Sequence, residues 1–113
     1  MIEIRLLFSD DRPTGFVCSG HALFAEEGSD IVCSAVSALT INTINSIREF
    51  TTDEAAVEQE EDGGYLSLLL RGEISDRSRV LLDSLFLGLS MIEETYGEEY
   101  LRIEEYHQVS EEI

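Results

Sequence analysis

Residues 16–38 read FVCSGHALFAEEGSDIVCSAVSA, and they contain a strand, a loop and the start of a helix. Residues 16–21 have the composition of a strand, whereas apolar residues recur at helical spacing from residue 30 to about residue 50. Asp30 or Ser29 is the expected helix N-cap. Residues 22–29 show no periodicity and include Glu-Glu-Gly, which indicates a loop. The strand end and the helix start are therefore expected at the same edge of a sheet.

Two hairpins are predicted, one on each side of this helix. The first joins residues 2–8, where apolar side chains alternate with charged ones, to residues 16–21 through the turn-forming residues 10–15. The second joins residues 55–61 to residues 65–71 through the sequence Asp-Gly-Gly. Each hairpin would add an antiparallel pair of strands to the sheet.

Residues 78–96 predict a second helix, with Gly97 as its C-cap. Its main apolar stripe is Leu82, Leu85, Leu89, Ile92 and Tyr96. Residues 101 to about 109 predict a last strand, although the alternation fails at Glu105 and His107. The order ββαββαβ predicts a single α+β domain over residues 1–113, with a small mixed or antiparallel sheet and two helices packed on it.

The charge balance narrows the range of partners. All seven basic residues are arginine, against 24 acidic residues, and the net charge is −17. Such a surface repels phosphate backbones, so direct binding to nucleic acid is not expected. A basic peptide or protein would be attracted to it. The alternative explanation, that the acidic residues only keep the protein soluble, remains open.

The compartment is predicted from what the sequence lacks. No apolar run is long enough to span a bilayer, and the first residues alternate Ile-Glu-Ile-Arg instead of forming a signal-peptide core. The two cysteines are too few for a disulfide framework. We therefore expect a soluble, cytoplasmic protein that does not contact a membrane.

One pair of residues has the chemistry of a nucleophile and its base. Cys33 would be the third residue of the first helix if Asp30 is the N-cap, and the unpaired N–H groups there favour thiolate over thiol. His21 follows Gly20 at the predicted strand end. A thiolate beside an imidazole is the activated nucleophile of cysteine hydrolases. From spacing alone, Cys33 is also compatible with a small buried side chain in a core helix.

A metal site built from Cys18, His21 and Cys33 is the less favoured interpretation. Cys18 has the opposite strand parity to His21, and a fourth ligand is missing unless Asp30 serves. We therefore predict no metal and no cofactor, with Cys18 in the core. His107 lies in an acidic segment and is expected to be a solvated surface residue.

The same stretch resembles the signature of the ribosomal-processing cysteine protease family, often called Prp. The matching residues are Gly20-His21-Ala22, then Gly28, then Asp30, Val32 and Cys33, followed by the small-residue helix Ser34-Ala35-Val36-Ser37. The resemblance implies a Cys33–His21 catalytic pair and a homodimer. It also implies a substrate: these enzymes remove a short N-terminal extension from a large-subunit ribosomal protein, the one numbered twenty-seven, beside an aromatic-containing motif.

Other roles are expected around this pair. Asp30 would cap the helix or orient His21, and N–H groups near Cys33 and Ser34 are candidate oxyanion donors. Ser37, one helical turn beyond Cys33, and Gly20 match further signature positions and are candidate cleft residues. Leu23 departs from the family signature, which often has Gly at this position. Leucine gives the backbone less conformational freedom than glycine, so we expect a more restricted loop than in the family.

Two non-protease functions stay open at this level. The chain could be an acidic adaptor that binds a basic ribosomal protein, with Cys33 purely structural, or a redox or metal-binding regulator. A homodimer is expected independently of the resemblance, because Phe86, Leu87 and Met91 widen the apolar face of the second helix beyond what one sheet contact needs.

Overall fold

The computed structural model describes residues 1–20, 29–61 and 64–108, and for Ser29 and Asp30 it describes the backbone only. Within these ranges the elements are β1 (Ile2–Ser9), β2 (Arg12–Ser19), α1 (Ser29–Phe50), β3 (Glu54–Gln59), β4 (Tyr65–Arg71), α2 (Asp76–Tyr96) and β5 (Leu101–Gln108). The predicted order ββαββαβ and the α+β class are confirmed. None of the described helices is long and apolar enough to cross a membrane.

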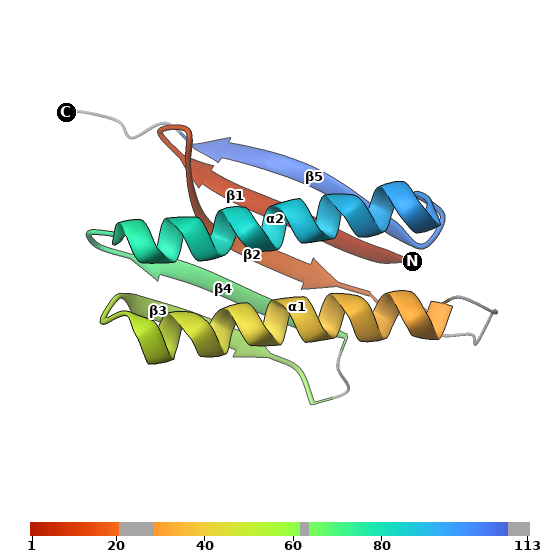
Figure 1. Cartoon of the computed structure of the whole chain (residues 1–113), viewed down its shortest axis with the longest axis horizontal. Helices are drawn as coiled ribbons and strands as arrows, with labels where there is room; N and C mark the ends of the chain where they lie inside the picture. The colour runs from red at the N-terminus through yellow and green to blue at the C-terminus, as the bar shows by residue number, and fades with distance from the viewer. Residues whose placement is uncertain (21–28, 62–63, 109–113) are drawn as a thin grey trace.

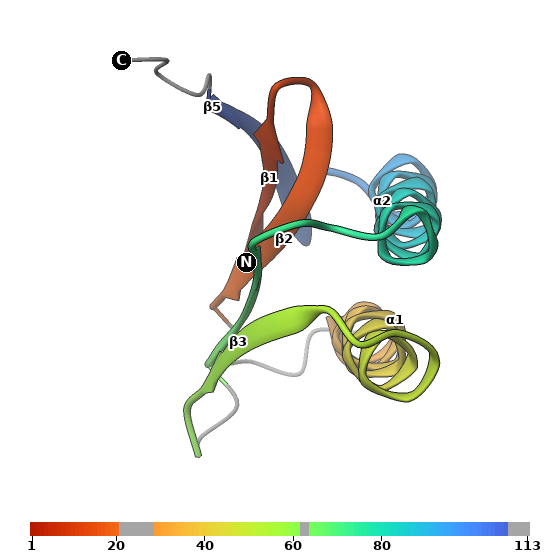
Figure 2. The same cartoon turned by 90° about the vertical axis from the view of Figure 1, so that its left-hand side faces the viewer.

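The strands form one mixed sheet in the order β3-β4-β2-β1-β5. All neighbouring strands are antiparallel except β1 and β5, which are parallel. Both helices lie on the same face of this sheet, side by side (Figures 1 and 2). The result is a two-layer structure whose second sheet face is open.

The core lies between the sheet and the helix layer. Ile2, Ile4 and Leu6 of β1 point into it at every second position, as the alternation predicts. The other buried apolar side chains are Phe16, Val32, Val36, Ile44, Ile47, Leu68, Leu70, Leu82, Leu85, Phe86, Leu89 and Leu101. Phe86 belongs to this core and contacts the Phe8 ring at 5.5 Å, so it does not widen an outer face as expected. Leu87 and Met91 are exposed.

The first turn is tighter than the sequence suggested. Asp10 and Asp11 have φ values of 51° and 63°, which is the conformation of a two-residue hairpin turn. β2 therefore begins at Arg12 and not near residue 16. Pro13 lies inside this strand, next to a register irregularity between Leu7 and Phe8. The irregularity accommodates a residue that has no N–H to donate.

Other element ends also shift. α1 begins at Ser29, β2 ends at Ser19, β3 spans Glu54–Gln59, and α2 begins at Asp76, two residues earlier than predicted. Tyr96, assigned to the buried stripe of α2, is exposed. β5 continues through Glu105 and His107 because it is an edge strand whose second half is solvent-exposed, so no apolar alternation is needed there.

A carboxylate at the end of α1 organises the start of α2. Asp53 Oδ2 accepts hydrogen bonds from Ser75 N at 3.1 Å, from Ser75 Oγ at 2.6 Å and from the buried Ser78 Oγ. Ser75 is the N-cap of α2, and its Oγ accepts from Ser78 N at 3.2 Å. Burial, the largest single influence, opposes ionisation of Asp53, but these donated bonds outweigh it and hold the pKa of Asp53 below its ordinary value.

We expect Asp53→Ala to destabilise the fold by about 2–4 kcal/mol, because it removes a charged acceptor and leaves the buried Ser78 hydroxyl with only the 3.5 Å hydrogen bond to Thr51 Oγ1. Since the pKa is lowered in the folded state, the contribution of Asp53 is present above the unfolded-state pKa and is lost as the pH falls through the folded-state value. Urea unfolding at several pH values should therefore show a flatter acid limb for the variant. The exposed Asp83→Ala is the matched control and should unfold like wild type.

Candidate active site

The candidate site lies where β2 ends, β4 begins and α1 starts, at one end of the molecule (Figure 1). Gly20 follows β2 with a φ of +89°, and its N–H donates to the Gly64 carbonyl at 3.0 Å. A Cβ at Gly20 would lie 2.4 Å from the Met1 carbonyl oxygen. Only glycine fits this junction. Its N–H is already engaged, so it is not a free oxyanion donor.

Cys33 is the fifth residue of α1, not the third as expected, because the helix begins at Ser29. Its side chain is partly buried and packs against the edge of the core. Asp30 lies inside the first turn, where an acidic residue complements the helix dipole. The unpaired N–H groups of a helix belong to its first four residues, and Cys33 and Ser34 follow them. The dipole effect on Cys33 is therefore weaker than its sequence position suggested.

Cys18 lies on the helix-facing side of β2 and is partly buried against the core, which confirms its predicted place. In the sheet register it is flanked by Ile4 on β1 and Leu66 on β4. Burial, and to a smaller extent the charge of Cys33, raises the pKa of the Cys18 thiol to about 11. The two thiols are thus electrostatic neighbours. Both thiols are partly buried, and Cys18 stays protonated at neutral pH.

Of the remaining predicted site residues, only Ser34 and Ser37 have side chains within the described part of the chain. His21 lies outside the described residues, and so does the Asp30 side chain. Ser34 and Ser37 are exposed on α1, and the Ser37 carbonyl accepts from Thr40 Oγ1 at 3.3 Å. The parity argument that separated Cys18 from His21 does not extend this far, because β2 ends at Ser19 and Gly20 leaves the strand conformation.

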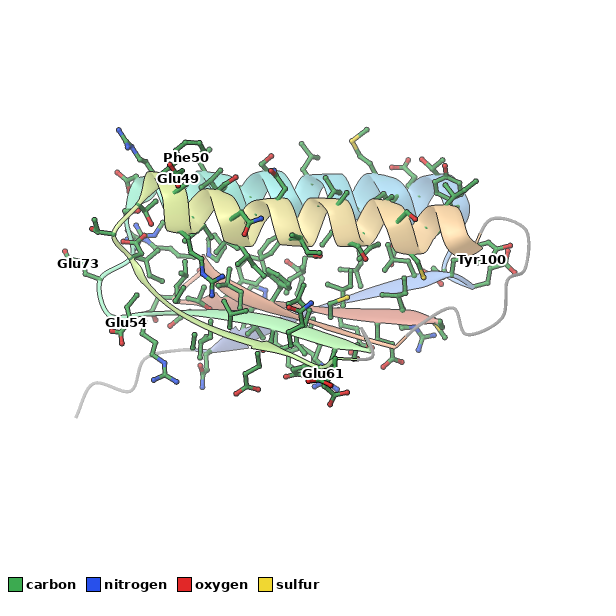
Figure 3. All side chains as sticks on the ribbon, turned by 90° about the horizontal axis from the view of Figure 1, so that it is seen from below. Glu49, Phe50, Glu54, Glu61, Glu73 and Tyr100 are labelled. Carbon is green, nitrogen blue, oxygen red and sulfur yellow. The ribbon has the colours of Figure 1, made fainter. Side chains whose placement is uncertain are left out.

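His107 lies at the opposite end of the sheet. It pairs in register with Phe8, its ring stacks on the Phe8 ring at 4.5 Å, and Nδ1 lies 3.8 Å from Asp11 Oδ1. No group of three or more metal-ligating side chains is assembled within the described ranges, which do not include His21. One residue that the sequence analysis did not single out, Tyr100, lies at the same end as the start of α1 (Figure 3).

The arginines are concentrated at one end of the molecule, whereas acidic residues lie at both ends. Five of the seven arginines lie at the end opposite to Cys33: Arg12, Arg48, Arg71, Arg77 and Arg79. At the Cys33 end, the acidic residues Glu58, Glu60, Glu61, Glu98 and Glu99 are not offset by these arginines. The field of the chain therefore favours the approach of a basic ligand from the Cys33 end.

The two cysteines should differ strongly in reactivity. At pH 7.5 we expect iodoacetamide to alkylate Cys33 and to spare Cys18, because a thiol with a pKa of about 11 is less than about 0.1% thiolate at that pH. Peptide mapping by mass spectrometry locates the adduct, and unfolding in urea should make both residues reactive. Similar rates at Cys18 and Cys33 in the folded protein would contradict the assignment. Modification of Cys18 should appear only as the pH rises toward 11.

The chain is similar to known proteins over most of its length. The family model described as cysteine protease Prp matches residues 1–101. The ribosomal processing cysteine protease Prp of Bacillus subtilis is 31% identical over 101 residues, covering 85% of this chain and 90% of that protein. Two solved structures of the essential ribosomal processing protease Prp from S. aureus are similar over 94% of this chain and all of theirs. One holds a covalently linked product peptide (TM-score 0.84, 27% identity) and the other a substrate peptide (TM-score 0.85, 26% identity).

Proposed function

Because the chain belongs to the family of Prp cysteine proteases, we propose that it is an endopeptidase with Cys33 as nucleophile and His21 as general base. The single observation that favours Cys33 over Cys18 is that burial raises the pKa of the Cys18 thiol to about 11, so Cys18 stays protonated at neutral pH. His21 follows Gly20, whose backbone junction brings the chain to the end of the sheet where α1 starts.

The proposed reaction has two steps. The Cys33 sulfur attacks the scissile carbonyl, His21 holds the thiol proton and delivers it to the leaving amine, and a thioester remains. Water, deprotonated by His21, then releases the new carboxylate and regenerates the thiol. The covalently linked product peptide in the S. aureus relative supports a covalent route of this kind. Ser34 and Ser37, exposed beside Cys33 on α1, would line the cleft, and Asp30 would orient His21 or stabilise the helix start.

The proposed substrate is a basic ribosomal protein, cleaved at a short N-terminal extension in the cytoplasm. Two observations support it: the relatives are named ribosomal processing proteases, and the acidic residues at the Cys33 end are not offset by the arginines, most of which lie at the other end. Ribosomal proteins are typically basic, which matches this field.

A peptide that spans the extension junction of that ribosomal protein tests the proposal. Wild-type protein should convert it into two products whose masses identify one cleaved bond, and no metal or cofactor should be needed. An intact peptide after prolonged incubation with folded protein would refute the protease. Tight binding without cleavage would instead favour the acidic adaptor.

We further propose that the protein is a homodimer that pairs through its helix layer. Val80, Leu87 and Met91 lie on the outer side of α2, and each is more than half exposed (66%, 65% and 58%). Ile31 and Ile41 are exposed on α1. Exposed apolar side chains that share one face usually mark an interface, and two-fold pairing is the commonest way to cover it. Sedimentation at micromolar concentration should give twice the chain mass; a clean monomer would contradict this.

A further inference from the structure

The sheet has two edge strands, β3 and β5, and their outward backbone groups differ in availability. On β3, Glu60 N donates to Tyr65 O at 3.1 Å, and the register continues without irregularity through Gln59–Leu66 to Glu54–Arg71. Hydrogen-bonded and non-bonded pairs alternate along an antiparallel ladder. The N–H and C=O groups of Ala55, Val57 and Gln59 therefore point away from the sheet.

The β5 edge is protected. Ile2 N donates to Tyr100 O and Asp10 N to Gln108 O, so the even-numbered residues of β5 face β1 and the odd-numbered ones face outward. One outward group, Ile103 N, already donates to Glu93 Oε2 of α2 at 2.8 Å. The next outward positions are Glu105 and His107. A bonded edge group and polar or charged residues are common ways to prevent further strand pairing.

The β3 edge also carries charged residues, Glu54 and Glu58, but in the described part of the chain its outward backbone groups are not bonded in the same way. Within the described residues, no side chain hydrogen-bonds to the outward groups of Ala55, Val57 or Gln59. The centre of the strand, Ala55-Ala56-Val57, carries neither charge nor proline. Figure 3 shows β3 along the near edge of the sheet, with Glu54 and Glu61 toward its two ends. This edge can accept another strand.

The charges beside this edge select the kind of strand. Ala55 and Val57 pack against the core, so the alternate residues Glu54 and Glu58 lie on the open face of the sheet. Both glutamates are exposed, and basic side chains on an added strand would lie next to them. We propose that the β3 edge docks an extended basic segment of the substrate as a sixth strand. This inference rests on the proposed protease function and names how its substrate is held.

The geometry also sets how far this segment lies from the scissile bond. Gln59, Leu66 and Cys18 form one row across β3, β4 and β2, and Cys33 lies near enough to Cys18 for its charge to raise the Cys18 pKa. Neighbouring strands are spaced at about 4.8 Å, so a strand added beyond β3 lies three spacings, or about 14 Å, from Cys18 on β2. An extended chain covers that distance in about four to five residues. The docked segment is therefore separated from the cleaved bond by at least that length.

A second copy of this chain is a poorer occupant of the same edge. Pairing β3 with β3 would bring the glutamates of two chains together, and each chain carries a net charge of −17. Like charges on adjacent strands are destabilising. If the dimer nevertheless formed here, a variant blocked at this edge would sediment as a monomer.

The test measures binding separately from catalysis. Fluorescently labelled peptides are titrated into the Cys33→Ala variant: one peptide spans the cleavage junction only, and the other adds the basic segment. The longer peptide should bind at least tenfold more tightly. N-methylation of alternate residues in the basic segment should remove that gain in one of the two alternation phases, because it blocks backbone pairing in that phase only.

Two protein variants locate the effect on β3. Ala55→Pro, which removes an outward N–H that the fold does not use, should weaken the longer peptide about three- to tenfold. Glu54→Gln combined with Glu58→Gln should weaken it and reduce its salt dependence. The matched controls, Glu105→Pro and the pair Glu104→Gln with Glu105→Gln, make the same changes on β5 and should leave binding unchanged.

The possible outcomes separate the two hypotheses. The docking proposal is wrong if the peptide methylated in one phase and the peptide methylated in the other both bind like the unmodified peptide, or if the longer peptide binds no more tightly than the short one. Cleavage of the short peptide by wild-type protein would still support the protease in that case. If the β3 changes weaken binding but wild-type protein cleaves neither peptide, the docking edge stands and the protease fails. The methylated peptides need no protein variant, so a failure of Ala55→Pro to fold leaves the test intact.

Discussion

Replacing Cys33 with alanine is expected to abolish cleavage of the junction peptide, lowering the rate by about four orders of magnitude or more. No other thiol can take its place, because burial, the larger cause of the raised Cys18 pKa, persists in the variant and keeps Cys18 protonated. Cys33→Ser should be almost as inactive, since an alcohol is a far weaker nucleophile than a thiolate without a strong base to activate it. The measurement is a single-turnover assay by mass spectrometry at equal concentrations of folded protein.

Cys18→Ala is the control for this prediction. It should retain activity and lose only a little stability, because Cys18 is partly buried and its small side chain makes limited core contacts. Circular dichroism and thermal unfolding must show that the Cys33 variants keep the wild-type fold. Turnover near the wild-type rate in either Cys33 variant would refute the nucleophile.

Replacing His21 with alanine should lower the rate by about 10²- to 10⁴-fold, the usual loss when a general acid–base is removed. His107→Ala is the matched control and should keep full activity, because His107 stacks on Phe8 at the other end of the sheet. The two histidines of the chain thus give opposite expectations for the same substitution. A loss of activity in His107→Ala with none in His21→Ala would mean that the base was assigned to the wrong residue.

Periodicity was a sound guide to the order of elements. The alternation in residues 2–8 and the helical spacing in residues 32–47 are local patterns. Ile2, Ile4, Leu6, Val32, Val36, Ile44 and Ile47 are buried as expected, whereas Phe8 and Leu39 are only partly buried against the core. Boundaries were less predictable. The positive φ angles of Asp10 and Asp11 close the hairpin in two residues. The composition of residues 10–15 is equally compatible with a longer turn that includes Pro13, so it could not predict the shorter one.

The least predictable features link distant parts of the chain. Asp53 accepts hydrogen bonds from Ser75 and Ser78, more than twenty residues away, so sequence spacing gave no sign of that cluster. The proximity of Cys18 to Cys33 depends likewise on how α1 packs over β2. Strand parity cannot be extended from Cys18 to residue 21, because β2 ends at Ser19 and Gly20 interrupts the alternation. The motif singled out Cys33 as the candidate nucleophile, and the tertiary packing explains why the pKa of the other cysteine, Cys18, is raised.

The parallel pairing of β1 with β5 has a consequence for the biogenesis of the protein. β1 is synthesised long before β5, yet the two strands are adjacent, with Ile2 N bonded to Tyr100 O and Asp10 N to Gln108 O. A ribosome-bound nascent chain therefore exposes one side of β1 until residues 101–108 emerge. Contacts between such distant residues slow folding, because a long loop must close before they form. This domain completes its sheet only after translation has passed β5, and shorter nascent chains remain dependent on protection from aggregation.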